Sequence, residues 1–168
     1  MTFIIDLQEQ PEPLAVSAGD GQEFTIIYRF MDTKERSTAV EFLSSVGLTS
    51  AWEIIRKTIL AWEGVQNPQK APIPYKVTNH EGVENTANLD LVFGRIPFNS
   101  LLMVICKIFA VNGVRFGRIR EAVAPFMDSP EQLKAWQEEL DRFQKGRQSK
   151  APASESFASS AGGNVSGK

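Results

Sequence analysis

The sequence predicts an α+β protein that is mainly helical, with a small N-terminal antiparallel β element and a disordered C-terminal tail. β-branched and aromatic residues concentrate before residue 31, apolar residues then recur at helical spacing, and Gly, Ser and Ala dominate from residue 146. A chain of 168 residues is long enough for one domain with a core. We expect a single globular domain over residues 1–145, with the β element at 1–31 and the helical part at 32–145, and a disordered tail at 146–168.

The β element is expected to contain up to three short strands. The strongest is Glu23–Phe30, EFTIIYRF, because its β-branched and aromatic side chains suit a half-buried strand. Phe3–Ile5 and Leu14–Val16 are two further short strands, and Gly19–Gly21 could form a hairpin turn. A small antiparallel sheet follows from this order.

Two capping boxes mark the first helices. Asp32 with Glu35 predicts a helix that ends at Gly47, and Ser50 with Glu53 predicts a second. The second helix would end at Gly64. Its apolar stripe would consist of Trp52, Ile55, Ile59 and Trp62.

The remainder predicts a loop followed by four helices. Val65–Glu84 holds prolines 68, 72 and 74 and no sustained period, so we expect a loop with a short extended piece at Pro72–Val77. The helices are expected from Thr86 to Gly94, from Pro97 to Asn112, from Val114 to Ala124 and from Pro130 to Lys145.

The helix beginning at Pro97 is apolar nearly all round. Leu101–Val111 is interrupted only by Lys107, yet it falls short of the ~18 apolar residues that a membrane span needs. It is therefore expected to be a core helix covered by its own fold or by another subunit, which makes self-association a prediction. No signal-peptide pattern opens the chain, so a cytosolic protein without membrane partners is expected.

The sequence carries none of the common catalytic motifs, such as a phosphate-binding GxxxxGK[ST] loop or a zinc-binding HExxH pair. Its only histidine, His80, fits a surface turn better than an oriented base. Its only cysteine, Cys106, lies in the apolar helix, where a buried thiol is inert. We therefore expect no enzyme activity, no cofactor and no metal site.

The formal net charge of −2 gives no overall reason to bind nucleic acid or an anionic membrane. There are three interpretations of one basic cluster, which consists of Arg115, Arg118 and Arg120 with Lys107 upstream. It could be a solvated or ion-paired face, a protein interface or a nucleic-acid site, although the last normally needs a basic domain.

Two short motifs give the chain a family resemblance. Trp62–Val65 reads WEGV and Pro72–Tyr75 reads PIPY, followed by the leucine-rich NLDLVFGRIP and the apolar helix. This order resembles the tail assembly chaperones of long-tailed bacteriophages, over roughly residues 20–115. The linker Gln66–Lys70 lacks the acidic turn usual in that family, and the C-terminal third extends beyond the shared motifs.

The resemblance implies a non-enzymatic chaperone in the host cell cytoplasm. Such a protein binds the tape measure protein, recruits tail tube subunits and leaves before the particle is finished. The alternative is a small structural or adaptor protein of the tail or neck that remains in the virion.

Two groups of aromatic and apolar residues, together with two arginines, are the candidate partner contacts. Trp62 is expected to pack with Tyr75, either as core or also as a partner groove. The stripe on the last helix is expected to dock in cis on the body or in trans on a partner helix. The full set of candidates is Trp62, Tyr75, Arg115, Arg118, Leu133, Trp136, Leu140 and Phe143.

Overall fold

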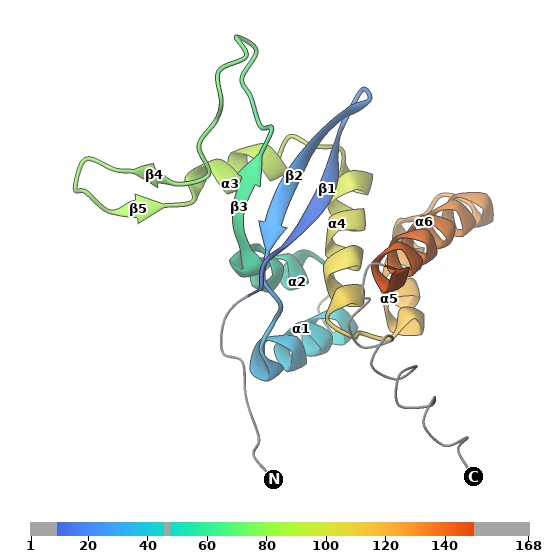
Figure 1. Cartoon of the computed structure of the whole chain (residues 1–168). Coiled ribbons are helices and arrows are strands. Elements are labelled where there is room, and N and C mark those ends of the chain that lie inside the picture. The colour runs from blue at the N-terminus through green and yellow to red at the C-terminus, as the bar shows by residue number, and fades with distance from the viewer. Residues whose placement is uncertain (1–9, 46–47, 150–168) are drawn as a thin grey trace, which may run out of the picture. The chain divides into compact units, whose positions relative to one another are not determined.

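A computed structural model describes residues 10–45 and 48–149. The chain divides into two compact units, Met1–Phe126 and Met127–Lys168. The first unit holds an antiparallel sheet and most of the helices, and the second holds one long helix (Figure 1). The predicted class, mainly α with a small N-terminal antiparallel sheet, is confirmed.

The sheet has three strands in the order β1-β2-β3, formed by Glu12–Gly19, Gln22–Tyr28 and Ile59–Glu63. Its first hairpin turns at Gly19–Gly21 as predicted, because those residues all have positive φ, at 92°, 52° and 73°. Alternate side chains on β1 and β2 are buried, so one face of this hairpin contributes to the core. The expected strand Phe3–Ile5 lies outside the described residues.

The third strand corrects the helix expected to run to Gly64. Helix α2, Leu48–Ile55, begins before Ser50 and passes through a 3-10 turn, η1, at Arg56–Thr58. The chain then becomes β3, which pairs with β2 so that Trp62 lies opposite Ile26. Ile59 and Trp62 are three residues apart, which fits a helical stripe. Pairing with the open edge of β2 satisfies backbone groups that a helix would have left unpaired there.

Helix α1, Thr33–Ser45, begins at the predicted capping box. The Glu35 backbone N–H donates to Asp32 Oδ1 at 2.7 Å, and the Asp32 N–H donates to Glu35 Oε2 at 3.0 Å. Both reciprocal bonds are therefore present, as the sequence pattern requires.

The rest of the first unit follows the predicted order. A two-stranded ladder that the sequence did not predict, β4 Val77–Thr78 and β5 Glu84–Asn85, stands at the end of the expected loop. The extended piece expected at Pro72–Val77 overlaps it only at Val77, and Pro72 forms an isolated bridge with Gln66. Three helices follow: α3 Ala87–Phe93, α4 Phe98–Val111 and α5 Phe116–Val123, the last ending in a 3-10 turn, η2, at Ala124–Phe126.

Helix α4 forms the centre of this unit's core. It contacts β1, α2 and α5, and Figure 1 shows it alongside the sheet. Residues on all its sides are buried, as predicted, including Leu102, Cys106 and Phe109. No single helix in the described ranges has the length and apolar composition of a membrane span. Only α3 and α4 together, bent by 119°, meet that criterion.

Helix α6, Pro130–Ser149, is the described part of the second unit. It begins as predicted, with the Gln132 N–H donating to Ser129 Oγ at 3.1 Å. The helix continues through Ser149, so the boundary expected at Lys145 was too early and Gly146–Ser149 belong to the helix. The remainder of the expected tail lies outside the described residues.

Candidate partner-binding site

Trp62 and Tyr75 form one interlocked unit, as the sequence predicted. The indole Nε1–H donates to the Ile73 carbonyl at 2.7 Å, and the Tyr75 hydroxyl donates to the Ile59 carbonyl at 2.6 Å. The two rings meet edge to face, with centroids 5.1 Å apart and planes at 80°. Trp62 stands on a strand and not at a helix end. Its packing was predicted correctly from a wrong local structure.

The chain between the two motifs is held by Gly64 and Asn67. Gly64 has φ 84°, the left-handed conformation that was expected, although it lets the chain leave the strand β3 and not a helix. Asn67 Oδ1 accepts hydrogen bonds from the backbone N–H groups of Gln69 and Ala71, at 3.0 and 2.9 Å. An asparagine side chain therefore closes the turn in the linker that lacks acidic residues.

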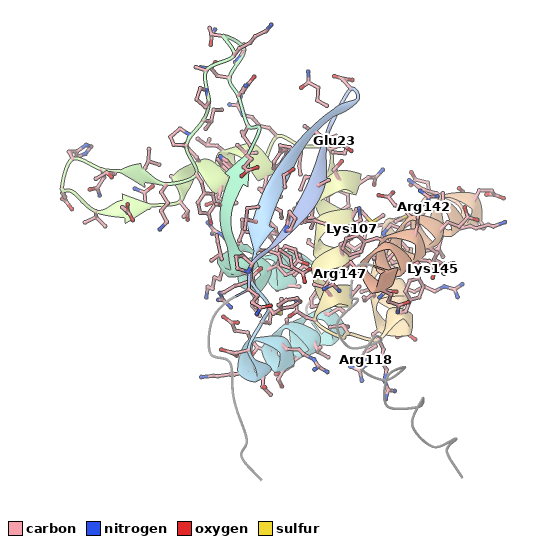
Figure 2. The ribbon with its side chains drawn as sticks, viewed as in Figure 1. Glu23, Lys107, Arg118, Arg142, Lys145 and Arg147 are labelled. Carbon is pink, nitrogen blue, oxygen red and sulfur yellow. The ribbon has the colours of Figure 1, made fainter. Side chains whose placement is uncertain are left out.

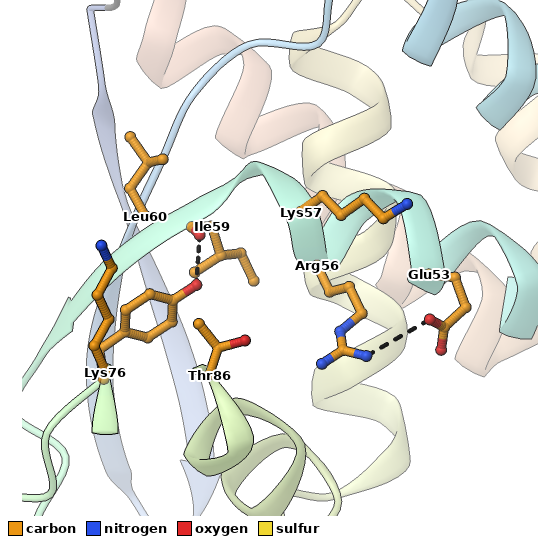
Figure 3. Close-up of a pocket in the computed structure, with 8 residues that line it drawn as sticks. Glu53, Arg56, Lys57, Ile59, Leu60, Lys76 and Thr86 are labelled. Atoms are coloured by element: carbon orange, nitrogen blue, oxygen red, sulfur yellow. Dashed lines mark hydrogen bonds and ion pairs between the residues drawn. The ribbon is translucent and has the colours of Figure 1, made fainter. Parts of the chain in front are cut away.

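A cleft of about 380 Å³ opens beside this unit (Figure 3). It is lined by Glu53, Arg56, Lys57, Ile59, Leu60, Tyr75, Lys76 and Thr86. Burial raises the pKa of the Tyr75 hydroxyl, and the nearby positive charge of Arg56 partly opposes this. Tyr75 therefore stays a neutral hydrogen-bonding group near pH 7.

The charges of this cleft are largely balanced by their neighbours. Arg56 Nη2 lies 2.7 Å from Asp90 Oδ2, and Arg56 Nη1 lies 3.6 Å from Glu53 Oε2. Lys76 Nζ lies 3.6 Å from Glu84 Oε2. The cleft thus offers polar and apolar contact surface, while its only lining carboxylate already faces an arginine.

The predicted basic cluster is divided between two helices. Arg115 is the exposed N-cap residue of α5, and Arg118 is exposed one turn further along. Figure 2 shows Arg118 on α5 and Lys107 on α4. Arg115 and Arg118 are therefore both exposed near the start of α5, apart from Lys107 on α4.

The predicted apolar stripe is the buried side of α6. Trp136 and Leu140 are 6% and 0% exposed, and Leu133 and Phe143 are half-buried. Charged residues such as Glu138 and Glu139 are exposed. The apolar and charged residues of α6 therefore lie on different faces of the helix, and docking of the apolar face in cis or in trans stays a prediction.

The reactive side chains singled out in the sequence have ordinary surroundings. Burial raises the pKa of the Cys106 thiol, so it stays protonated at neutral pH. His80 is exposed in the turn that Asn79 closes by accepting from the backbone N–H groups of Glu81 and Val83. Within the described ranges, no group of three or more His, Cys, Asp and Glu side chains could hold a metal ion.

Comparisons with protein-family models, curated proteins and solved structures found no match to this chain. The resemblance therefore rests on the two short sequence motifs, WEGV and PIPY. Sequence reasoning missed Arg56, because its two carboxylate partners come from α2 and α3, and only the fold brings them together.

Proposed function

We propose that this protein is a phage tail assembly chaperone that binds the tape measure protein and recruits tail tube subunits in the host cell cytoplasm. The observation that carries the proposal is the interlocking of the two family-like motifs. Trp62 of the first donates to Ile73 of the second, and Tyr75 of the second donates back to Ile59, just before the first. Motifs that depend on each other in this way support the resemblance better than two unrelated matches.

An exposed aromatic pair supplies apolar contact area for such a client. Phe98 and Phe126 are 54% and 42% exposed, and their ring centroids lie 5.4 Å apart. Exposed aromatic pairs are suited to covering the apolar face of a partner helix. A tape measure protein presents long apolar helical surfaces, which is why it needs a covering protein.

Co-expression with a tape measure fragment tests the proposal. We expect the fragment to aggregate alone, and to stay soluble and co-purify when the full chain is present. The double change Phe98→Ser and Phe126→Ser should reduce the captured fragment several-fold. Val83→Ser, at another apolar side chain that is 56% exposed, is the matched control and should leave capture unchanged.

Mass spectrometry of purified particles separates the chaperone from the adaptor. A chaperone is absent from finished tails but present in assembly intermediates. Stoichiometric recovery from mature particles would instead identify a structural or adaptor protein and overturn the proposal.

A further inference from the structure

Asn112 and Gly113 lie where α4 ends, and they are the only Asn-Gly pair in the 168-residue chain. In such a pair the glycine backbone nitrogen can attack the carbonyl carbon of the asparagine side chain, because glycine has no side chain to hinder the approach. The fold needs both residues at these positions, and the same contacts that need them keep them from reacting.

Gly113 is required by the way α4 ends. Its φ is 77°, and its N–H donates to the Ala110 carbonyl at 3.1 Å. The Val114 N–H donates to the Phe109 carbonyl, also at 3.1 Å. These two bonds form a Schellman motif, in which a left-handed glycine helps to satisfy the last carbonyls of a helix. The nitrogen that would attack Asn112 is therefore bonded back to the helix.

Asn112 is required by the packing around the same helix end. Its Oδ1 accepts from the Met31 N–H and its Nδ2 donates to the Ile108 carbonyl, both at 2.8 Å. The residue is 8% exposed, so water does not freely replace these partners. Both ends of the side-chain amide are occupied. A bond between its Cγ and the Gly113 nitrogen cannot form unless these contacts open.

We propose that Asn112–Gly113 is a self-modification site that the folded chain protects and that unfolding opens. In the open chain the Gly113 nitrogen loses its proton and bonds to Asn112 Cγ. The Cγ–Nδ2 bond breaks, and ammonia leaves with that proton. Water then opens the resulting succinimide ring at either carbonyl, which gives aspartate or isoaspartate. The reaction consumes one water molecule, releases one ammonia molecule and involves no oxidant or reductant.

Either product should fit the native site less well than Asn112. Aspartate has no N–H to donate to the Ile108 carbonyl, so this bond is lost and a carboxylate oxygen faces that carbonyl. Aspartate also places a negative charge at the C-terminal end of α4, where the helix dipole is negative. Isoaspartate adds a backbone carbon to the turn. A chain that reacts while unfolded therefore refolds to a less stable state.

Ageing the full chain with and without guanidinium chloride tests the proposal. Both samples are kept in the same mildly alkaline buffer and digested, and conversion at Asn112 is followed by mass spectrometry. We expect the native chain to convert at least about tenfold more slowly than the unfolded chain, because the rate follows the population of the open state. Native conversion as fast as conversion in denaturant would overturn the proposal.

Two controls in denaturant test the chemistry, because every chain is unfolded there. Gly113→Ala should slow conversion at Asn112 severalfold, since its methyl group hinders the attacking nitrogen. Asn99, which Ser100 follows in the same chain, should also convert more slowly than Asn112. An unchanged rate in Gly113→Ala, or equal rates at the two asparagines, would overturn the assignment of the site.

The effect on refolding is measured with Asn112→Asp, which carries the side chain of one product. We expect its unfolding midpoint to lie at a lower denaturant concentration than that of the wild type. An unchanged midpoint would show that modification leaves the fold intact, and would overturn the inferred effect of the modification on stability.

Discussion

Asn112 is a single side chain that joins two distant parts of the first unit. Its Oδ1 accepts from the Met31 backbone N–H and its Nδ2 donates to the Ile108 carbonyl, both at 2.8 Å. It is 8% exposed, so water cannot replace these partners freely. The side chain therefore fixes the end of α4 to the segment that leads into α1.

Removing this amide should be costly. We expect Asn112→Ala to lower the free energy of unfolding by about 1–3 kcal/mol, because it leaves the part-buried Met31 N–H without its acceptor and removes the side-chain bond to the Ile108 carbonyl. Urea denaturation measures the change. Asn99→Ala, at an exposed position of the same helix, should stay within about 0.5 kcal/mol. Similar losses at both positions would contradict the assignment.

Glu35 gives the protein a predictable response to acid. The pKa of its carboxyl is lowered from 4.5, first by the hydrogen bonds from Arg29, while burial opposes the shift. A lowered folded pKa means that this stabilisation is complete above the unfolded value and is lost as the pH falls through the folded value. We expect the stability difference between wild type and Glu35→Gln to shrink below about pH 4.5. A difference that is constant from neutral to acid pH would show that the ion pair contributes nothing.

At the scale of elements, β3 shows where local pattern and tertiary structure disagree. The capping box of α1 and the ends of α3 and α4 depend on neighbours within a few residues, so the sequence predicts them well. The identity of β3 depends on β2, far away in the chain, which offers an edge for it to pair with. For the same reason the ion pairs of Arg56 with Glu53 and Asp90 could not be predicted.

A substitution at Gly64 tests whether the chain needs a left-handed backbone conformation where it leaves β3. Its φ of 84° strains any residue with a Cβ, although the nearest atom to an added Cβ would be Phe24 Cα at an unstrained 3.7 Å. We expect Gly64→Ala to cost about 1–2 kcal/mol in thermal or urea unfolding, all from backbone strain. Gly117→Ala, inside α5 with nothing within 4 Å, should be neutral or gain up to about 1 kcal/mol. If both changes have the same sign, backbone strain is not the reason.

Trp136 tests the role of α6. If α6 docks in cis, we expect Trp136→Ala to lower the free energy of unfolding by about 3–5 kcal/mol, the range for a large buried aromatic residue. Docking in trans would give a different result, in which folding survives and capture of the tape measure fragment is lost. If neither stability nor capture changes, the stripe has no role.

At the scale of the whole molecule, two expectations concern self-association and the C-terminal segment. Self-association stays a prediction. The sequence favoured it because an apolar helix can need cover from another subunit. That argument is weakened, because residues on all sides of α4 are already buried within one chain. Light scattering at tens of micromolar is the measurement, and Phe98→Ser with Phe126→Ser should lower the mass if the exposed aromatic pair joins copies.

The C-terminal segment should be dispensable for folding. Residues 150–168 hold only Phe157 and Val165 as sizeable apolar side chains, so burial cannot offset the cost of ordering them. We expect truncation after Ser149 to leave the melting temperature unchanged within error. A drop of several degrees would mean that the segment docks on a folded unit. Truncation after Lys145 is a useful comparison, because it also removes the last turn of α6.

The order of the strands has a consequence for synthesis on the ribosome. β1 and β2 can pair as soon as they emerge, but the apolar face of this hairpin is covered by later segments. Phe24 meets Phe93 of α3, and β1 packs against α4. At a synthesis rate of roughly 5–20 residues per second, the apolar face of the hairpin stays exposed for several seconds before α3 and α4 are made. During that interval the exposed apolar face of the nascent chain can bind the cell's folding factors or a second chain being made on the same messenger RNA.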